Sequence, residues 1–66
     1  MNVTVNGKSM EIPDGLTIDG LLAHLSVKRE FTAVAVNTEI TPRADFAGTV
    51  LTEGDRVEIV RPMGGG

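Results

Sequence analysis

An Asn-Gly pair at residues 6–7, set between two alternating runs, restricts the fold of this 66-residue chain more than any other feature. Two apolar residues on each side of the pair alternate with polar ones. They are Val3 and Val5 before it, and Met10 and Ile12 after it. Asn-Gly favours a two-residue hairpin turn because both central residues must adopt positive φ. A turn at 6–7 pairs Val5 with Lys8 and Val3 with Met10, so the four apolar side chains share one face. The sequence therefore predicts an N-terminal β-hairpin.

One segment of the chain has helical periodicity. Apolar residues with the spacing i, i+3, i+4 and i+7 are Ile18, Leu21, Leu22 and Leu25. This spacing places them on one stripe of a helix. Thr17 is a good N-cap, and Asp19 in the first turn suits the helix dipole. We expect one amphipathic helix over residues 17–25.

Two more strands are expected in the C-terminal half. Residues 33–37, AVAVN, are apolar on both faces and small on one of them, which is typical of a central strand. Residues 56–60, RVEIV, alternate after a turn at 53–55. Between these strands an irregular segment begins at Ile40, with a short helical turn expected at 44–47.

The order of these elements indicates an α+β fold. A single helix with one apolar stripe must cover the single apolar face of the sheet. If the first and last strands both run through the middle of the sheet, they pair in parallel through a crossover that contains the helix. This is the ubiquitin-like β-grasp arrangement, a mixed four- to five-stranded sheet with one main helix on one face. We assign residues 1–61 to this domain and residues 62–66 to a flexible C-terminal glycine tail.

The composition excludes several classes of function. The chain has no cysteine, so disulfides, thiolate nucleophiles and cysteine-ligated metals are excluded. A net charge of −3 argues against nucleic acid and fits a basic protein partner better. No apolar run approaches the roughly 20 residues of a membrane span, and the N-terminus does not resemble a signal peptide. We expect a cytoplasmic protein.

Groups that could perform catalysis are few. His24 lies on the flank of the apolar helix stripe, where a histidine is usually solvated, and it has no second histidine or cysteine to join it at a metal. Glu53 and Asp55 flank a turn glycine and more readily shape that turn than share a proton. No glycine-rich phosphate loop follows a strand. We expect a protein that is not an enzyme in its own right and that binds no metal.

The C-terminal sequence RPMGGG directly follows the last expected strand. Five residues beyond Arg61 reach at most about 17 Å when extended, which is enough to enter a neighbouring active site. The three terminal glycines have no side chains, so the end of the tail is narrow. The carboxylate of Gly66 is then the one group that chemistry could use. The alternative interpretation is a disordered end without function, as is common for termini.

Two residues outside the tail are candidates for contact with a partner. Arg43 follows Pro42 in the irregular segment, where it either pins that segment or faces a partner, and we favour the structural role. Val60 is expected to face away from the core, together with Ala33 and Ala35. A small apolar patch that ends at the tail would make a docking surface.

The chain also resembles a known family, the ThiS sulfur carrier proteins of thiamine biosynthesis, over essentially its whole length. The resemblance lies in the order and spacing of short motifs: MNVTVNGKSMEI at the start, residues 17–25, AVAVN at 33–37, Pro42-Arg43, LTEGDRVEIV at 51–60, and Gly65-Gly66.

This resemblance implies a chemical cycle on Gly66. A partner similar to ubiquitin-activating enzymes would adenylate the carboxylate with ATP and magnesium, and a persulfide sulfur donor would convert it to a thiocarboxylate. The sulfur would pass to thiazole synthase. Gly64 and Gly65 would enter the partners' active sites, and Val60, Arg43 and Met63 are the candidate docking residues. The carrier itself is expected to bind no cofactor.

Three alternatives stay open at this point. The small subunit of molybdopterin synthase is similar in fold and tail but usually longer. A ubiquitin-like protein modifier would be joined through Gly66 to lysines of target proteins. A plain interaction domain would carry a tail that has no function.

Overall fold

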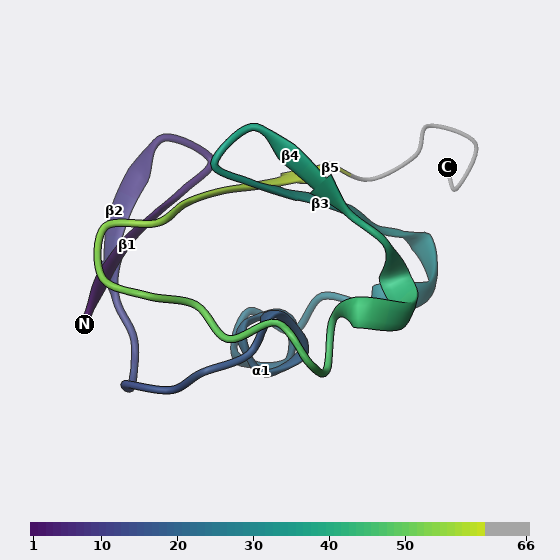
Figure 1. Ribbon diagram of the computed structural model, residues 1–66, viewed down its shortest axis with the longest axis horizontal. Helices are drawn as coiled ribbons and strands as arrows, with labels where there is room; N and C mark the ends of the chain where they lie inside the picture. The colour runs from purple at the N-terminus through teal and green to yellow at the C-terminus, as the bar shows by residue number, and fades with distance from the viewer. Residues whose placement is uncertain (61–66) are drawn as a thin grey trace.

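The computed structural model describes residues 1–60, which form a five-stranded sheet with one main helix packed on one face (Figure 1). The strands lie in the order β2-β1-β5-β3-β4. Their bounds, with that of the helix, are β1 Asn2–Val5, β2 Lys8–Glu11, α1 Ile18–His24, β3 Ala33–Val36, β4 Glu39–Thr41 and β5 Arg56–Val60. The expected β-grasp fold is confirmed. The expected domain boundary after residue 61 and the tail at 62–66 lie outside the described residues.

The N-terminal hairpin has the register that the sequence predicts. Val3 pairs with Met10, and Val5 pairs with Lys8. Asn6 and Gly7 form the turn with φ values of 50° and 84°. Val3 and Val5 are buried, and Met10 packs against the core. The hairpin therefore places one apolar face over the helix.

Helix α1 begins and ends as its sequence indicates. The Gly20 N–H donates to the Thr17 hydroxyl at 3.1 Å, which confirms Thr17 as the N-cap. Ile18, Leu21 and Leu22 are buried against the sheet, and Leu25 forms the C-cap. The helix spans Ile18–His24, so the expected ends at 17 and 25 are its two cap residues.

Strand β5 lies in the middle of the sheet. It pairs in parallel with β1, where Thr4 is opposite Arg56, and antiparallel with β3, where Ala33 is opposite Val60. The parallel pair needs the expected crossover, and α1 lies within it beneath the sheet (Figure 1). Strand β3 has neighbours on both sides, as its apolar sequence predicts.

The segment between β4 and β5 closes the core from below. It contains the 3₁₀ turn η2 (Arg43–Asp45), one residue earlier than the turn expected at 44–47. Phe46 and Leu51 from this segment are each about 1% exposed and complete the core. The Ile18 N–H donates to the Thr49 carbonyl at 3.0 Å, which ties the segment to the start of α1.

The sequence pattern was wrong about where the irregular segment begins, because Ile40 lies in β4. Strands β3 and β4 are joined by a two-residue turn at Asn37 and Thr38, whose φ values are 52° and 72°. The second position of such a turn favours glycine, and threonine there is rare because a β-branched side chain is strained at positive φ. The hairpin consequently lacks the Asn-Gly signal that identified the first one.

Replacing Thr38 with glycine should therefore stabilise the protein. A left-handed residue other than glycine costs about 1–2 kcal/mol, and the greater freedom of glycine in the unfolded chain offsets part of the gain. We expect Thr38→Gly to raise the free energy of unfolding by about 0.5–1 kcal/mol, measured by urea denaturation. The reciprocal variant Gly7→Thr should lower it. A Thr38→Gly protein less stable than the parent would contradict the strain assigned to this turn.

Candidate functional site

The structure defines the point from which the C-terminal tail departs. Met63, Gly64, Gly65 and Gly66 lie outside the described residues, so their predicted roles stay predictions. The last described residue, Val60, ends the central strand β5. Strand β5 is the middle strand of the five, so the described chain ends at the centre of the sheet rather than at its edge.

Val60 lies on the outer face of the sheet, away from α1. On β5 the side chain of Val57 is fully buried and Ile59 packs against the core, whereas Val60 is 60% exposed. Ala33 is directly opposite Val60 across the β3–β5 pair, so it shares this face. The predicted outward orientation of Val60 is thereby confirmed. Whether it contacts a partner is a separate question.

An apolar outer patch surrounds Val60. We give this name to Val60, Ala33, Ala35 and Ile40. Ala35 pairs with Ile40 on β4, and Ile40 is 72% exposed. The sequence pattern predicted Ala33 and Ala35 but missed Ile40, because β4 was not recognised. The remainder of the same face is polar; it consists of Asn2, Thr4, Ser9, Glu11, Arg56 and Glu58. The apolar part of the outer face is thus confined to the side on which β5 ends.

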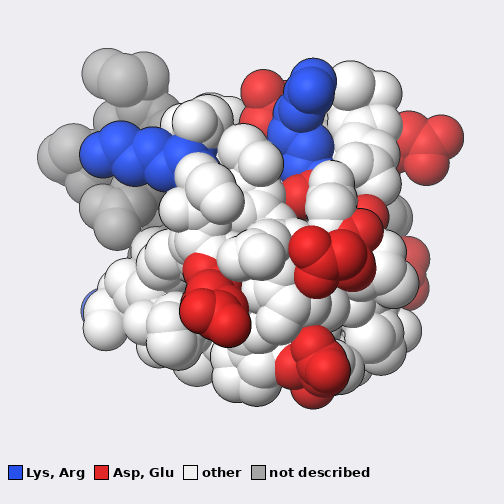
Figure 2. Space-filling view, turned by 90° about the vertical axis from the view of Figure 1, so that its left-hand side faces the viewer, with Lys and Arg blue, Asp and Glu red and all other residues white. Residues whose placement is uncertain are grey.

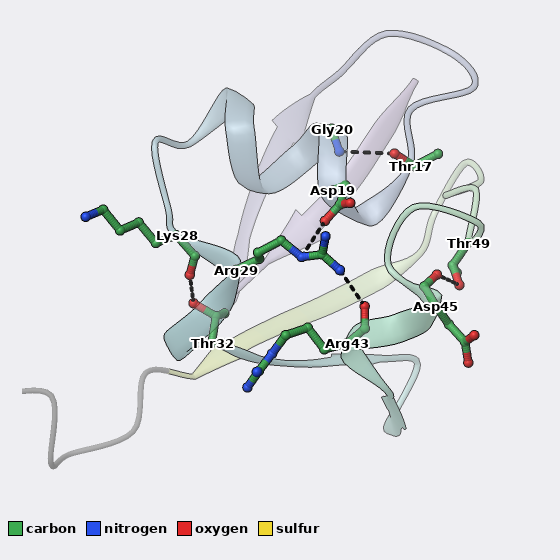
Figure 3. A network of polar contacts seen from close by, with 9 residues as sticks. All are labelled: Thr17, Asp19, Gly20, Lys28, Arg29, Thr32, Arg43, Asp45 and Thr49. Atoms are coloured by element: carbon green, nitrogen blue, oxygen red, sulfur yellow. Dashed lines mark hydrogen bonds and ion pairs between the residues drawn. The ribbon is translucent and has the colours of Figure 1, made fainter.

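Arg29 ties three elements together, the turns η1 and η2 and the helix α1 (Figure 3). It lies in the 3₁₀ turn η1 (Arg29–Phe31). Its Nε is 3.5 Å from Asp19 Oδ1 on α1, and its Nη2 donates to the Arg43 carbonyl at 2.9 Å. Its guanidinium carbon lies 5.9 Å from the centre of the Phe46 ring, within cation–π range. Arg29 therefore holds η2 against the first turn of α1.

Arg43 is held through its backbone rather than its side chain. Within residues 1–60 its guanidinium makes no hydrogen bond or ion pair, and Figure 3 shows it pointing away from Arg29. The pinning role that the sequence analysis favoured for Arg43 belongs instead to Arg29. The contact between Arg29 and the Arg43 carbonyl could not be inferred from the Lys28-Arg29 pair in the sequence, because η1 and η2 come together only in the folded chain.

The end of the molecule that carries the N-terminus is rich in carboxylates (Figure 2). The Asn2 N–H donates to Glu53 Oε1 at 2.9 Å, and the N-terminal amino group lies 3.2 Å from Asp14 Oδ1. These carboxylates accept backbone or terminal donors, and the groups around them form no shared-proton pair. Among residues 1–60 no three histidine, cysteine or acidic side chains are grouped as metal ligands.

The carboxylate of Asp55 shapes a turn, as predicted. Burial raises its pKa, but hydrogen bonds from the Thr52 N–H, the Asn37 side-chain amide and the Thr52 hydroxyl outweigh this effect and hold the pKa below its usual value. His24 is exposed at the end of α1, which agrees with the predicted solvated position. No helix within residues 1–60 is long and apolar enough to cross a membrane. Residues 1–60 thus include the strand end from which the tail continues and the apolar outer patch. They include no group of side chains arranged for catalysis.

Comparison with known proteins points to one family. The model of the ThiS family matches residues 3–66. The structure is similar to the crystal structure of the thiamine biosynthesis protein ThiS from Geobacter metallireducens. The two chains match over the full length of each, with a TM-score of 0.88 and 39% sequence identity. The sulfur carrier protein ThiS of Escherichia coli is 29% identical over the full length of both chains.

A longer relative also matches the whole chain. The thiazole synthase of Paramagnetospirillum magneticum is 35% identical over 66 residues. The chain spans 20% of the length of that relative, so the similar segment is one part of a larger protein.

The hydrogen bonds to Asp55 predict a pH dependence of stability. Because its pKa is lower in the folded protein, the carboxylate stabilises the fold above the unfolded value of about 3.9, and this contribution is lost as the pH falls through the folded pKa. Asp55→Asn should cost about 1 kcal/mol at pH 7 and clearly less at pH 2.5, measured by urea denaturation. Asp45→Asn, at an exposed position, is the control and should change little at either pH. A cost for Asp55→Asn that does not fall with pH would contradict this role.

Proposed function

The chain belongs to the ThiS family, and from this membership we propose that it is a sulfur carrier protein of thiamine biosynthesis that acts through the carboxylate of Gly66. One observation carries the proposal: the family match runs to residue 66 and so includes the terminal glycines as well as the folded domain. A resemblance of fold alone would have supported only a ubiquitin-like domain. The carrier is a co-substrate of its partner enzymes rather than a catalyst.

The first step of the proposed cycle makes the carboxylate reactive. A carboxylate oxygen of Gly66 attacks the α-phosphorus of ATP in the active site of an adenylating enzyme similar to ubiquitin-activating enzymes. Pyrophosphate leaves, and magnesium held by that enzyme balances the phosphate charge. The product is an acyl-adenylate whose leaving group is AMP. The carrier contributes only the carboxylate and the narrow Gly64-Gly65 segment that brings it there.

The second step exchanges oxygen for sulfur. The terminal sulfur of a persulfide donor attacks the Gly66 carbonyl carbon and displaces AMP, and a thiol then cleaves the sulfur–sulfur bond to leave a thiocarboxylate. The chain has no cysteine that could intercept the activated carbonyl. This composition supports a carrier on which the sulfur travels at the tail.

Thiazole synthase is the acceptor that we propose for this sulfur. In the relative from Paramagnetospirillum magneticum, which bears that name, a segment similar to this chain is part of the longer polypeptide. A second relative named thiazole synthase, from Magnetococcus marinus, has the same arrangement, with 35% identity over 20% of its length. Joining two functions in one chain raises their effective concentration, which supports a direct encounter between carrier and synthase.

We propose that partners dock on the apolar outer patch. It is exposed, it is continuous with the end of β5, and the core packs on the other face of the sheet, so a partner can cover it without disturbing the fold. Arg43, with its guanidinium open to solvent, and Met63 would add contacts at the rim. A partner seated there would lie beside Val60, the residue after which the tail begins.

Two alternatives would use the same group differently. A carrier for molybdopterin synthesis would pass the same thiocarboxylate to a different acceptor, and a protein modifier would form an isopeptide bond. The match to a carrier of equal length and the two thiazole synthase relatives favour the thiamine pathway.

Removal of Gly66 tests the proposal. The variant that lacks this residue should unfold at the same urea concentration as the parent, because the buried core lies within residues 3–57. It should support no ATP–pyrophosphate exchange by the adenylating enzyme, whereas the full chain should. Exchange at the parental rate without Gly66 would overturn the proposal, and an unfolded variant would contradict the separation of fold and tail.

A charge in the apolar outer patch should weaken docking. We expect Val60→Glu to raise the KM for the carrier in the exchange assay about tenfold, which corresponds to about 1.4 kcal/mol. The matched control is Val50→Glu, because Val50 is 53% exposed but lies outside the patch, bridged to Thr17 beside α1. Both changes should alter stability by less than about 0.5 kcal/mol. Equal KM values for the two variants would remove the patch from the docking surface.

A further inference from the structure

The side-chain amide of Asn6 takes the place of a peptide group beside β5. Strand β1 ends at Val5, and the chain turns at Asn6. The Asn6 N–H still donates to the Val57 carbonyl at 2.9 Å, as in a parallel ladder. Beyond it the Ile59 N–H donates to Asn6 Oδ1 at 2.8 Å, and Asn6 Nδ2 donates to the Ile59 carbonyl at 3.3 Å. The amide therefore continues the hydrogen-bond ladder along β5 for one more residue, Ile59, after β1 has ended.

This contact lies at Ile59, one residue before the end of β5, and the tail follows that end in the sequence. On one side Val60 pairs with Ala33, the first residue of β3. On the other side β1 has already ended, so Asn6 supplies the last partner for β5 there. With the amide present, the end of β5 is held from both sides. Without it, the Ile59 peptide would face water on the β1 side, and the final residues of β5 would be held by β3 alone.

We infer that Asn6 is a positioning residue for the chemistry at Gly66, because its amide clamps Ile59 and so sets the direction in which the chain leaves the sheet. The inference rests on the proposed function. Six residues separate Val60 from the chain end, and when extended they span at most about 20 Å. When a partner holds the tail extended, a rotation of about 10° at Ile59 displaces the Gly66 end by roughly 3–4 Å, and a misplacement of about 1 Å can cost a hundredfold in rate.

A second asparagine, which bonds the other end of β5, provides a control. Asn37 also has positive φ, 52° against 50° for Asn6. Its Oδ1 accepts from the Arg56 N–H at 2.9 Å, and its Nδ2 donates to Asp55 Oδ1 at 3.0 Å. It thus clamps β5 with the same functional group, but at the end far from the tail. Glycine at either position removes the amide and tolerates the positive φ. Each substitution removes one acceptor of a β5 N–H, and Asn37→Gly removes in addition the hydrogen bond to Asp55.

The test compares Asn6→Gly with Asn37→Gly in ATP–pyrophosphate exchange by the adenylating enzyme. Both variants should lose stability in urea. We expect Asn6→Gly to lower kcat about tenfold while KM for the carrier stays within about twofold, because the apolar outer patch is unchanged. Asn37→Gly should keep the parental kcat. Asn6→Asp, which retains an oxygen to accept from the Ile59 N–H, should recover most of the loss.

Amide hydrogen exchange reports the clamp without any partner. In Asn6→Gly the Ile59 amide should exchange at least about tenfold faster than in the parent, because it has lost its acceptor. In Asn37→Gly it should keep its protection. Unchanged exchange at Ile59, or equal kcat for the two glycine variants when the parent is active, would overturn the inference alone. A parent chain that supports no pyrophosphate exchange would overturn the proposed function, and this inference with it.

Discussion

The parallel pairing of β1 with β5 is the interaction on which the rest of the structure depends. It brings the last strand into the middle of the sheet beside the first, with Thr4 opposite Arg56 and Val5 opposite Val57. A parallel pair requires a crossover, and the crossover places α1 on one face only. The described chain therefore ends on the middle strand, and within residues 1–60 no layer covers the opposite face of the sheet.

This arrangement separates stability from chemistry. Among residues 1–60 the ten buried hydrophobic residues form one core on the helix side of the sheet, and none of them belongs to the outer face. The Arg29 contacts with Asp19, Arg43 and Phe46 close the helix side independently of that face. A partner can consequently cover the apolar outer patch and draw in the tail while the core stays as it is. In the proposed function, this separation is what lets a small carrier present one terminal carboxylate to several enzymes without changing its core.

Elements with a clear local signal, and the sheet order that follows from them, were predicted, whereas a hairpin without that signal and individual side-chain contacts between distant segments were not. The first hairpin and α1 follow from Asn6-Gly7 and the apolar stripe, whereas β4 was missed because its turn carries Asn37-Thr38. The role of Arg29 was missed because its partner Arg43 lies 14 residues away in sequence. The Asn6 clamp spans 53 residues and cannot be seen before β1 and β5 are known to be neighbours. The tail chemistry stays a prediction, because residues 62–66 lie outside the described residues and the cycle on Gly66 was inferred from the family resemblance.

The most direct test of the sulfur-carrier account is the intact mass of the protein purified from its own cells under reducing conditions. The account predicts a fraction heavier by the difference between one sulfur and one oxygen atom, with the change located at Gly66 by fragmentation. Treatment with ATP, the adenylating enzyme and a persulfide donor should increase that fraction. A chain that retains a plain carboxylate at Gly66 after this treatment would contradict the account.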